Sequence, residues 1–279
     1  MLLASLCAAS MGALIKHVGQ TIPVFEILFI RQLFVLMFIS PVLIRTWRTV
    51  FKTDHFRFHA MRGGFAVIAM STGFTAVVNM PLAEVTAISF VRTLFATLLA
   101  IIFLSEKVGV RRWAVTVTGF IGVLIIIRPD AGEFNQYALF ALTSSLFVAG
   151  IMILLRKLSQ IDPPSTIITY QSVFVTTFMA GPALYYWVTP TWLELGLVLV
   201  IGGIMSVMQW LFIQAYKVAE ASAVAPIEYV RLLFATLLGI IFFSEVPTVW
   251  TVLGASIIIC STLYTAHRNT IKKQQSEKT

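Results

Sequence analysis

Two arginines, Arg92 and Arg231, lie in the middle of long hydrophobic segments and have the strongest potential for binding chemistry. Each is about ten residues from the nearer end of its segment, so a helix crossing a bilayer would place it near the midplane. An arginine there costs about 2.5–3.5 kcal/mol on insertion scales. A guanidinium can hold a carboxylate or phosphate through two parallel hydrogen bonds. We therefore expect both arginines to face the protein interior, where each either binds an anionic ligand or locks neighbouring helices together.

Glu228 is the acidic residue closest in sequence to these arginines. It precedes Arg231 by three residues and would share its helical face. Pro226 lacks an N–H group, so we expect the helix to kink or unwind at that point. Three roles remain open for Glu228: partner of Arg231, binder of an amine on a ligand, or proton site.

Uncharged polar residues within the hydrophobic segments complete the candidate site. Gln209 and Trp210 are adjacent, and Tyr170 lies near the end of another segment. A tryptophan beside a glutamine suits an organic ligand with an apolar body and polar groups. Core packing is the alternative for each of these residues. Arg31 follows Glu26 by five residues, too far to face it neatly, and we expect Arg31 to extend towards the outer membrane interface.

The composition of the chain requires a membrane to surround it. Of its 279 residues, 58% are hydrophobic and 11% are charged, with a mean hydropathy of +0.91, whereas a soluble domain carries about 25% charged residues. The net charge of +8 does not indicate nucleic-acid binding, because the basic residues are spread through short gaps between hydrophobic segments. Cys7 and Cys260 have no disulfide or metal-binding spacing, and no cofactor motif is present.

Ten hydrophobic segments are long enough to cross a bilayer. We read the first as a retained span rather than a signal peptide, because no charged region precedes it. The polar tail, residues 267–279, is expected to be disordered. The segments lie near residues 1–19, 23–44, 63–80, 82–104, 113–128, 136–155, 166–188, 193–216, 222–243 and 249–266.

The distribution of basic residues predicts the orientation. If both termini are cytoplasmic, 15 Lys and Arg residues fall in inside segments, against 2 in outside segments. This asymmetry predicts an inner-membrane protein with both ends in the cytoplasm. His55 and His59, in the basic loop 45–62, are spaced as metal ligands could be. Because no further ligand is near, we expect this loop to dock on anionic headgroups instead.

The chain also contains an internal repeat. Residues 90–106 read FVRTLFATLLAIIFLSE and residues 229–245 read YVRLLFATLLGIIFFSE, with 13 of 17 positions identical. The same offset pairs Gly63-Gly64 with Gly202-Gly203. The sequence thus predicts two copies, residues 1–135 and 136–266. Each copy holds five spans, an odd number, so the second must enter the membrane in the opposite sense. Such inverted repeats characterise secondary transporters, whose substrate site lies between the halves.

This two-copy plan resembles the EamA family of the drug/metabolite transporter superfamily. The resemblance rests on LAEVTAISFVRTLFATLLAIIFLSE, AEASAVAPIEYVRLLFATLLGIIFFSE and GFIGVLIIIRP, and it extends over nearly the whole chain. The segments RRWAVTVTGFIGVLIIIRP and YWVTPTWLELGLVLVIGG are most similar to the S-adenosylmethionine-carrier group. The resemblance implies a ten-helix carrier of a small metabolite. Many members of the family have an uncharged residue or proline in place of Arg92 and Arg231.

We therefore interpret the chain as an all-α membrane protein of ten transmembrane helices in two inverted five-helix repeats. Its expected function is transport of a small organic metabolite, such as an amino acid or S-adenosylmethionine, by alternating access. The matched helices should lie on opposite sides of one central cavity. A lipid flippase is the main alternative. A membrane-embedded transferase would need clustered catalytic groups, and the spans contain no aspartate. Whether two chains form a homodimer stays open.

The orientation is testable by labelling single cysteines in intact cells. A membrane-impermeant reagent should modify a cysteine placed at Asn135, on the predicted periplasmic side, and should not reach one placed at Thr53. Labelling of Thr53 without Asn135 would contradict the predicted orientation.

Overall fold

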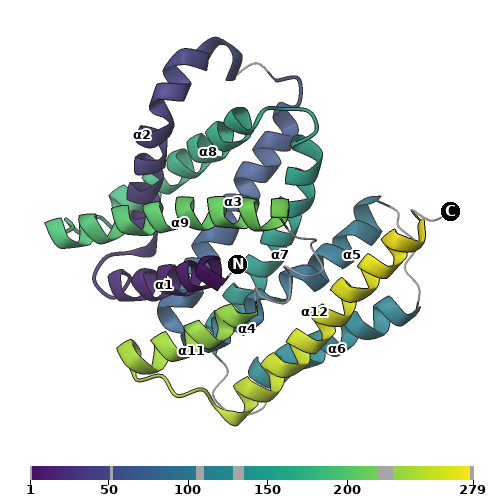
Figure 1. The fold of residues 1–279 in the computed structure, drawn as a ribbon. Helices are drawn as coiled ribbons and strands as arrows, with labels where there is room; N and C mark the ends of the chain where they lie inside the picture. The colour runs from purple at the N-terminus through teal and green to yellow at the C-terminus, as the bar shows by residue number, and fades with distance from the viewer. Residues whose placement is uncertain (1, 51–52, 105–109, 128–134, 219–228, 277–279) are drawn as a thin grey trace.

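Helices account for all the regular structure in the described residues, and no strand occurs among them (Figure 1). The computed structural model describes residues 2–50, 53–104, 110–127, 135–218 and 229–276; for some residues inside helices only the backbone is described. The all-α fold is therefore confirmed. The helices are α1 (Leu2–Val18), α2 (Val24–Val50), α3 (Phe56–Asn79), α4 (Leu82–Ser89), α5 (Arg92–Leu104), α6 (Val110–Ile127), α7 (Gln136–Leu158), α8 (Pro164–Tyr185), α9 (Trp192–Val218), α11 (Val230–Phe243) and α12 (Val249–Ser276).

The fourth predicted span, residues 82–104, is broken into two helices. Phe90 and Val91 separate α4 from α5, and their N–H groups donate to carbonyls three residues earlier, at 3.2 and 3.0 Å. Such bonds wind the backbone more tightly than an α-helix does, and a short 3₁₀ stretch of this kind often marks a functional hinge. The kink expected at Pro226 lies outside the described residues.

Two other sequence expectations need correction. The loop predicted at residues 45–62 is largely helical, because α2 continues to Val50 and α3 already begins at Phe56. The polar tail was expected to be disordered from residue 267, yet α12 extends to Ser276.

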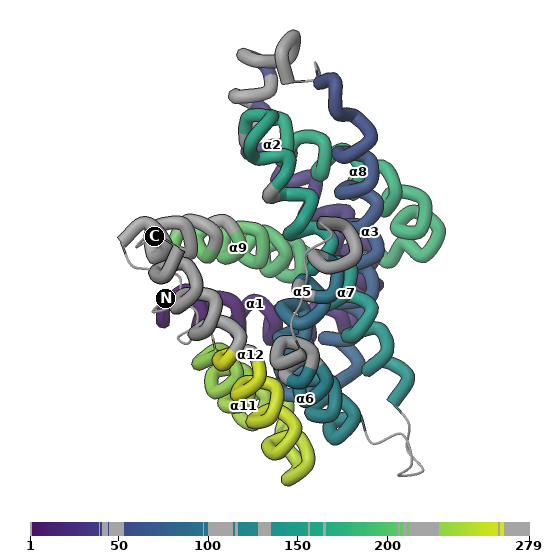
Figure 2. Tube along the Cα trace, turned by 90° about the vertical axis from the view of Figure 1, so that its right-hand side faces the viewer, coloured from purple at the N-terminus to yellow at the C-terminus, as the bar shows by residue number. Residues whose placement is uncertain are grey.

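The contacts between helices repeat when the two copies are exchanged. Helix α3 packs on α7, and the counterpart of that pair, α9 on α1, also packs. Likewise α5 contacts α7 and α11 contacts α1. These contacts of the described helices thus recur between equivalent partners in the two copies, as an inverted repeat requires. The helices of the two copies interleave throughout (Figures 1 and 2).

Corresponding parts of the two copies meet in three places, and the pseudo-two-fold axis must pass between the partners at each place. On α2 and α8, Gln32 donates to the Ser172 hydroxyl at 2.7 Å. Where α5 and α11 begin, the rings of Phe90 and Tyr229 meet edge to face, with centroids 4.7 Å apart. Helices α6 and α12 form the third pair. The matched segments therefore meet at Phe90 and Tyr229, where they begin, and the cavity expected between them stays a prediction.

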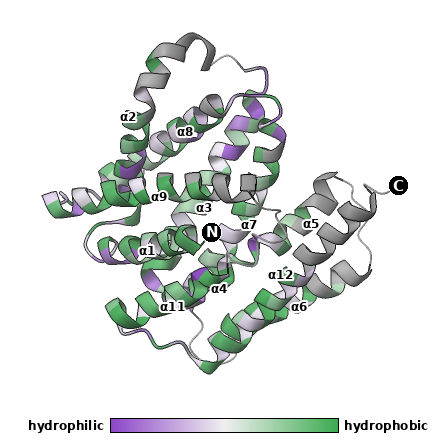
Figure 3. Ribbon diagram, viewed as in Figure 1, coloured by the Kyte–Doolittle hydropathy of each residue, from purple (hydrophilic) through white to green (hydrophobic). Residues whose placement is uncertain are grey.

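The helices consist mainly of hydrophobic residues, as Figure 3 shows, and many of these side chains face outward. Large side chains such as Phe38, Leu124, Phe178 and Phe242 are more than half exposed. A lipid environment makes this exposure favourable, whereas in water such a surface would aggregate. Within the described residues, three segments are both long and apolar enough to cross a membrane: Phe56–Asn79, Gln136–Leu155 and Thr166–Tyr185. Shorter apolar helical segments occur at Leu2–Val18, Val117–Ile127, Trp192–Met205, Val230–Phe243 and Val249–Ser261.

The crossing of α6 and α12 depends on two glycines. A Cβ atom at Gly254 would lie 2.5 Å from the carbonyl oxygen of Gly122, and one at Gly122 would lie 2.8 Å from that of Gly254. Backbone atoms cannot move aside as a flexible side chain can. These glycines let the two helices approach closely, which is how membrane helices gain packing energy.

We predict that Gly254→Ala destabilises the protein by about 1–3 kcal/mol, because the added methyl group overpacks the helix crossing. The matched control is Gly203→Ala, since a Cβ atom there meets nothing within 4 Å. Melting of the two purified variants measures the difference. Equal melting temperatures for Gly254→Ala and the wild type would contradict the close helix crossing.

Candidate functional site

Arg92 and Arg231 occupy equivalent places beside the pseudo-two-fold axis. Arg92 is the first residue of α5, and Arg231 is the second residue of α11. The contact between Phe90 and Tyr229 brings the beginnings of these helices together. Both arginines are half-buried, and each takes part in an interaction within the protein. The structure thus places the two guanidinium-bearing residues at two helix N-termini near one axis, which favours negative charge at that point.

The other residues proposed from the sequence are distributed more widely. Tyr170 is buried on α8, where its ring stacks on His59 with centroids 4.6 Å apart. Gln209 and Trp210 belong to α9, but their side chains are outside the described part of the structure. Glu228 also lies outside the described residues.

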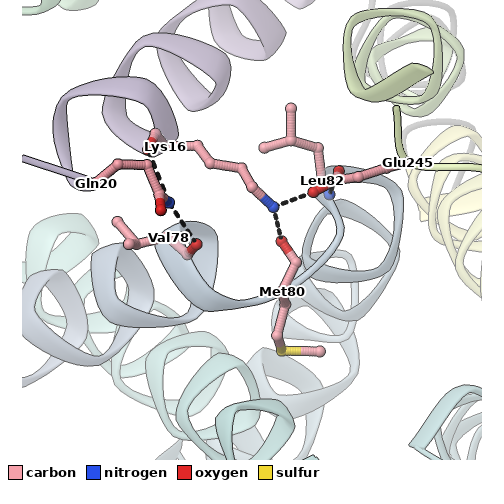
Figure 4. Close-up of polar contacts among 6 residues, drawn as sticks. All are labelled: Lys16, Gln20, Val78, Met80, Leu82 and Glu245. Atoms are coloured by element: carbon pink, nitrogen blue, oxygen red, sulfur yellow. Dashed lines mark hydrogen bonds and ion pairs between the residues drawn. The ribbon is translucent and has the colours of Figure 1, made fainter. Parts of the chain in front are cut away.

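A buried polar cluster joins the two copies where α1 ends (Figure 4). We call Lys16, Met80, Leu82 and Glu245 the Lys16 cluster. The ammonium of Lys16 donates to the Met80 carbonyl at 2.6 Å and forms a salt bridge with Glu245. The other carboxylate oxygen of Glu245 accepts the Leu82 N–H at 2.8 Å. Because both charges are largely withdrawn from solvent, losing either one would leave the other unpaired at considerable cost.

Local backbone geometry directs Glu245 into this cluster. Ser244 ends α11 with a left-handed conformation, φ 56°, which folds the following residue back along the helix. A Cβ atom at Gly239 would lie 3.1 Å from a Glu245 carboxylate oxygen. The matched position in the first copy is Ala100. The glycine therefore gives the carboxylate room against the last turns of α11.

A second polar cluster joins the copies at the beginning of α3. We call Thr53, His59, Asp162 and Tyr170 the His59 cluster. The Asp162 carboxylate lies 2.9 Å from His59 Nε2 and accepts the Thr53 hydroxyl at 3.0 Å. His59 is only 1% exposed. The expected role of His59 in a loop docked on lipid headgroups is therefore wrong, because the residue is buried between the two copies.

Helix α3 connects the two clusters. His59 lies near its first residue, and Met80 directly follows its last residue. The 21 intervening steps along a helix span roughly 30 Å, which matches the hydrocarbon thickness of a bilayer. The Lys16 and His59 clusters therefore lie at opposite membrane faces, which the charge distribution predicts to be periplasmic and cytoplasmic, respectively.

Arg31 lies inside the protein and not at the membrane interface. It is 2% exposed, and its Nη1 atom is 2.8 Å from the sulfur of Met205 on α9. Its Nη2 atom is 3.3 Å from the sulfur of Met70 on α3. The expectation that Arg31 extends to the interface is wrong because α3 and α9 enclose it.

A hollow of about 700 Å³ lies on the surface formed by Asp54–Phe58, Ala60 and Met61. It includes none of the site residues proposed from the sequence. Among the described residues, no three or more His, Cys, Asp and Glu side chains are grouped so that they could hold a metal ion.

Sequence reasoning missed Lys16, Glu245 and Arg31 as site residues for different reasons. Glu245 is the charged last residue of the matched segment 229–245, and no residue spaced along the same helix in the sequence indicates a partner for it. The replacement of Ala100 by Gly239, within an otherwise matched stretch, was an available signal that the second copy accommodates something there. Pairing Lys16 with Glu245 required the fold, because 229 residues separate them.

Comparisons with known proteins agree with this architecture. The model of the EamA-like transporter family matches residues 1–128 and 135–266. A solved crystal structure superposes with a TM-score of 0.58 at 17% sequence identity, covering 96% of this chain and 94% of the other, which supports the fold.

Several characterised transporters are similar over most of their length. The S-adenosylmethionine uptake transporter of Rickettsia bellii is 28% identical, covering 99% of this chain and 94% of the relative. The riboflavin transporter of Vibrio cholerae is 35% identical, and the match covers 83% of this chain and 78% of the relative. The pseudopaline exporter of Pseudomonas aeruginosa is 28% identical, and the match covers 92% of this chain and 91% of the relative. This chain belongs to the EamA-like transporter family, and it is a multi-pass membrane transporter of small metabolites rather than an enzyme.

Proposed function

We propose that this protein carries an amino-acid-derived metabolite such as S-adenosylmethionine across the inner membrane by alternating access. The observation that supports this most is the meeting of two helix N-termini, each with an arginine, at the axis between the copies. In inverted-repeat transporters, broken helices point their positive N-terminal ends at anionic groups of the substrate near the midplane.

The binding group in this proposal is the carboxylate of the metabolite. Arg92 is our preferred contact, because the guanidinium plane can hold both carboxylate oxygens. Arg231 would have Glu228 as its partner, so it contributes less to the substrate. Gln209, Trp210 and Tyr170 remain proposed contacts for the organic body of the metabolite.

The requirement for an anionic group guides the choice of substrate. Relatives named as S-adenosylmethionine transporters and as riboflavin transporters both align with this chain. S-adenosylmethionine has a carboxylate, whereas riboflavin has no ionised acidic group. Two arginines at the axis therefore favour the amino-acid derivative.

The Lys16 cluster supplies a means of alternating access. It ties α1 to the turn between α3 and α4 and to the end of α11, so it fastens one copy to the other at the predicted periplasmic face. We propose that this contact holds that face closed and breaks when the face opens. This face is periplasmic if both termini are cytoplasmic, as the basic residues predict.

We predict that proteoliposomes containing the purified protein take up radiolabelled S-adenosylmethionine, and that Glu245→Gln lowers the initial rate roughly 5-fold or more. A contact that couples two conformations typically changes their balance by about that factor. The control is Asp54→Asn, an exposed carboxylate outside both clusters, which should leave the rate unchanged.

Two separate outcomes would count against these claims. If neither S-adenosylmethionine nor any amino acid enters above the level of empty liposomes, the amino-acid-derived assignment fails, and uptake of riboflavin alone would contradict it. If uptake occurs but Glu245→Gln equals the wild type, the Lys16 cluster is not a gate.

We predict that Arg92→Lys lowers uptake by about 10-fold while the folded yield stays nearly unchanged, because the charge survives but the planar fork is lost. Arg231→Ala should lower both yield and uptake, since it leaves Glu228 without its partner. Adding Glu228→Gln to Arg231→Ala should restore yield, measured by size-exclusion chromatography. Normal uptake by both Arg92→Lys and Arg92→Ala would exclude Arg92 from substrate binding.

A further inference from the structure

Arg31 is a buried cation whose neighbours are too weak to balance its charge. Its residue exposure is 2%, and α2, α3 and α9 surround it. A charge this deeply buried ordinarily has an oppositely charged partner and good hydrogen bonds. The nature of its contacts is therefore informative.

The contacts of Arg31 are mainly with soft and neutral groups. Two of its N–H groups point at the sulfurs of Met205 and Met70, at 2.8 and 3.3 Å, and thioethers are weak hydrogen-bond acceptors. The ring centroid of Phe74 lies 5.5 Å from the guanidinium carbon. The amide oxygen of Gln32, at 3.3 Å, is the one strong acceptor that the described residues supply.

No carboxylate among the described residues pairs with Arg31, and its Nε atom has no hydrogen-bond partner there. Glu26, on the same helix, accepts instead from the Val188 N–H at 3.1 Å. In this respect Arg31 differs from Lys16, which has a carboxylate within its cluster. The guanidinium of Arg31 retains binding capacity that the protein itself does not use.

We propose that Arg31 is an oxyanion-binding site for the carboxylate of the transported metabolite. The carboxylate would replace the two methionine sulfurs and form the bidentate contact that a guanidinium favours. Methionine side chains are unbranched and flexible, so Met70 and Met205 can move aside as the ligand enters. Phe74 and the displaced methionines would then pack against the apolar body of the metabolite.

This site is separate from the arginine pair at the axis. Arg31 lies seven residues from the start of α2, about 10 Å along the helix, whereas Arg92 lies ten residues beyond Leu82, about 15 Å along its span. Both helices start at the Lys16 end. The same carboxylate can therefore occupy Arg31 and Arg92 in turn as the copies move. The inference rests on the proposed function for its substrate class.

The first experiment tests the site without assuming a metabolite. The melting temperature of the purified protein is measured with sodium butyrate and with butyramide, its neutral analogue, at constant ionic strength. Butyrate should raise the melting temperature more than butyramide does, since it binds the folded state. Arg31→Met should lose this difference between butyrate and butyramide, whereas the exposed control Arg57→Met should keep the difference. Arg31→Lys should bind butyrate about 10-fold more weakly than the wild type does.

The melting temperature without ligand separates a binding role from a structural one. If the charge of Arg31 serves to bind a ligand, the melting temperature of Arg31→Met should equal or exceed that of the wild type. The substitution replaces an unbalanced buried charge with an apolar side chain of similar length. If the sulfur and ring contacts serve only to hold helices together, the variant should melt lower.

The second experiment uses S-adenosylmethionine and 5′-methylthioadenosine, which has the same nucleoside and a sulfur but no carboxylate. Arg31→Met should weaken binding of the first by about 10–100-fold and leave the second unchanged, as expected for one charge-assisted contact. Three outcomes would overturn the site at Arg31. S-adenosylmethionine could bind Arg31→Met as tightly as it binds the wild type. The effect of butyrate on the melting temperature could survive in Arg31→Met, or it could be absent from the wild type. A butyrate effect that depends on Arg31, without any binding of S-adenosylmethionine, supports the site and rejects the metabolite.

Discussion

The bilayer offers no water to polar groups, and this constraint determines how the two copies fit together. A charged side chain placed within the hydrocarbon is costly unless groups of the protein or of a bound ligand satisfy it. Lys16 and Glu245 meet this requirement across the copies, with backbone groups of Met80 and Leu82 completing the cluster. His59 and Asp162 do so at the other face. Separating the halves at either face would break these polar contacts, so the clusters help to hold the two copies together.

Close helix packing meets the same constraint by a different route. Apolar side chains gain little by leaving lipid for a protein interior, so helices associate through dispersion contacts at short range. Gly122 and Gly254 allow α6 and α12 to touch through their backbones. At α3 and α7, the Ser144 hydroxyl donates to the Ala69 carbonyl at 2.7 Å. Small residues thus allow the polar atoms of neighbouring helices to reach one another.

The inverted repeat turns these contacts into a transport mechanism. Corresponding helices meet at the axis, and in the proposed mechanism a movement that loosens contacts at one face would tighten contacts at the other. The break at Phe90 and Val91 lies beside that axis and provides a place where the fourth span can bend. Arg31, Arg92 and Arg231 bring positive charge into the interior, which suits a cargo that carries a carboxylate more than one that has no anionic group.

The sequence by itself determined the elements and their symmetry. Length and hydropathy predicted where the spans lie, because a helix must be apolar over a fixed length to cross a bilayer. The bounds were less well predicted, since α2, α3 and α12 continue six to ten residues beyond the predicted spans. The identity of residues 90–106 with 229–245 predicted the duplication, and an odd number of spans per copy made it inverted. The family resemblance followed from the same residues and was confirmed by the family match.

Only the tertiary structure decided which side chains meet. The sequence suggested that Arg31 reaches the interface and that His59 lies in a lipid-facing loop, yet both are buried because helices distant in sequence cover them. It contained no reason to pair Lys16 with Glu245, since local spacing predicts only neighbours on one helix. The break after Ser89 was also invisible, because neither glycine nor proline marks it. Which side chains are buried, and which residues they contact, depends on how helices from opposite halves pack. A transmembrane helix is hydrophobic on nearly all sides, so its hydrophobic pattern does not show which side faces another helix and which faces lipid.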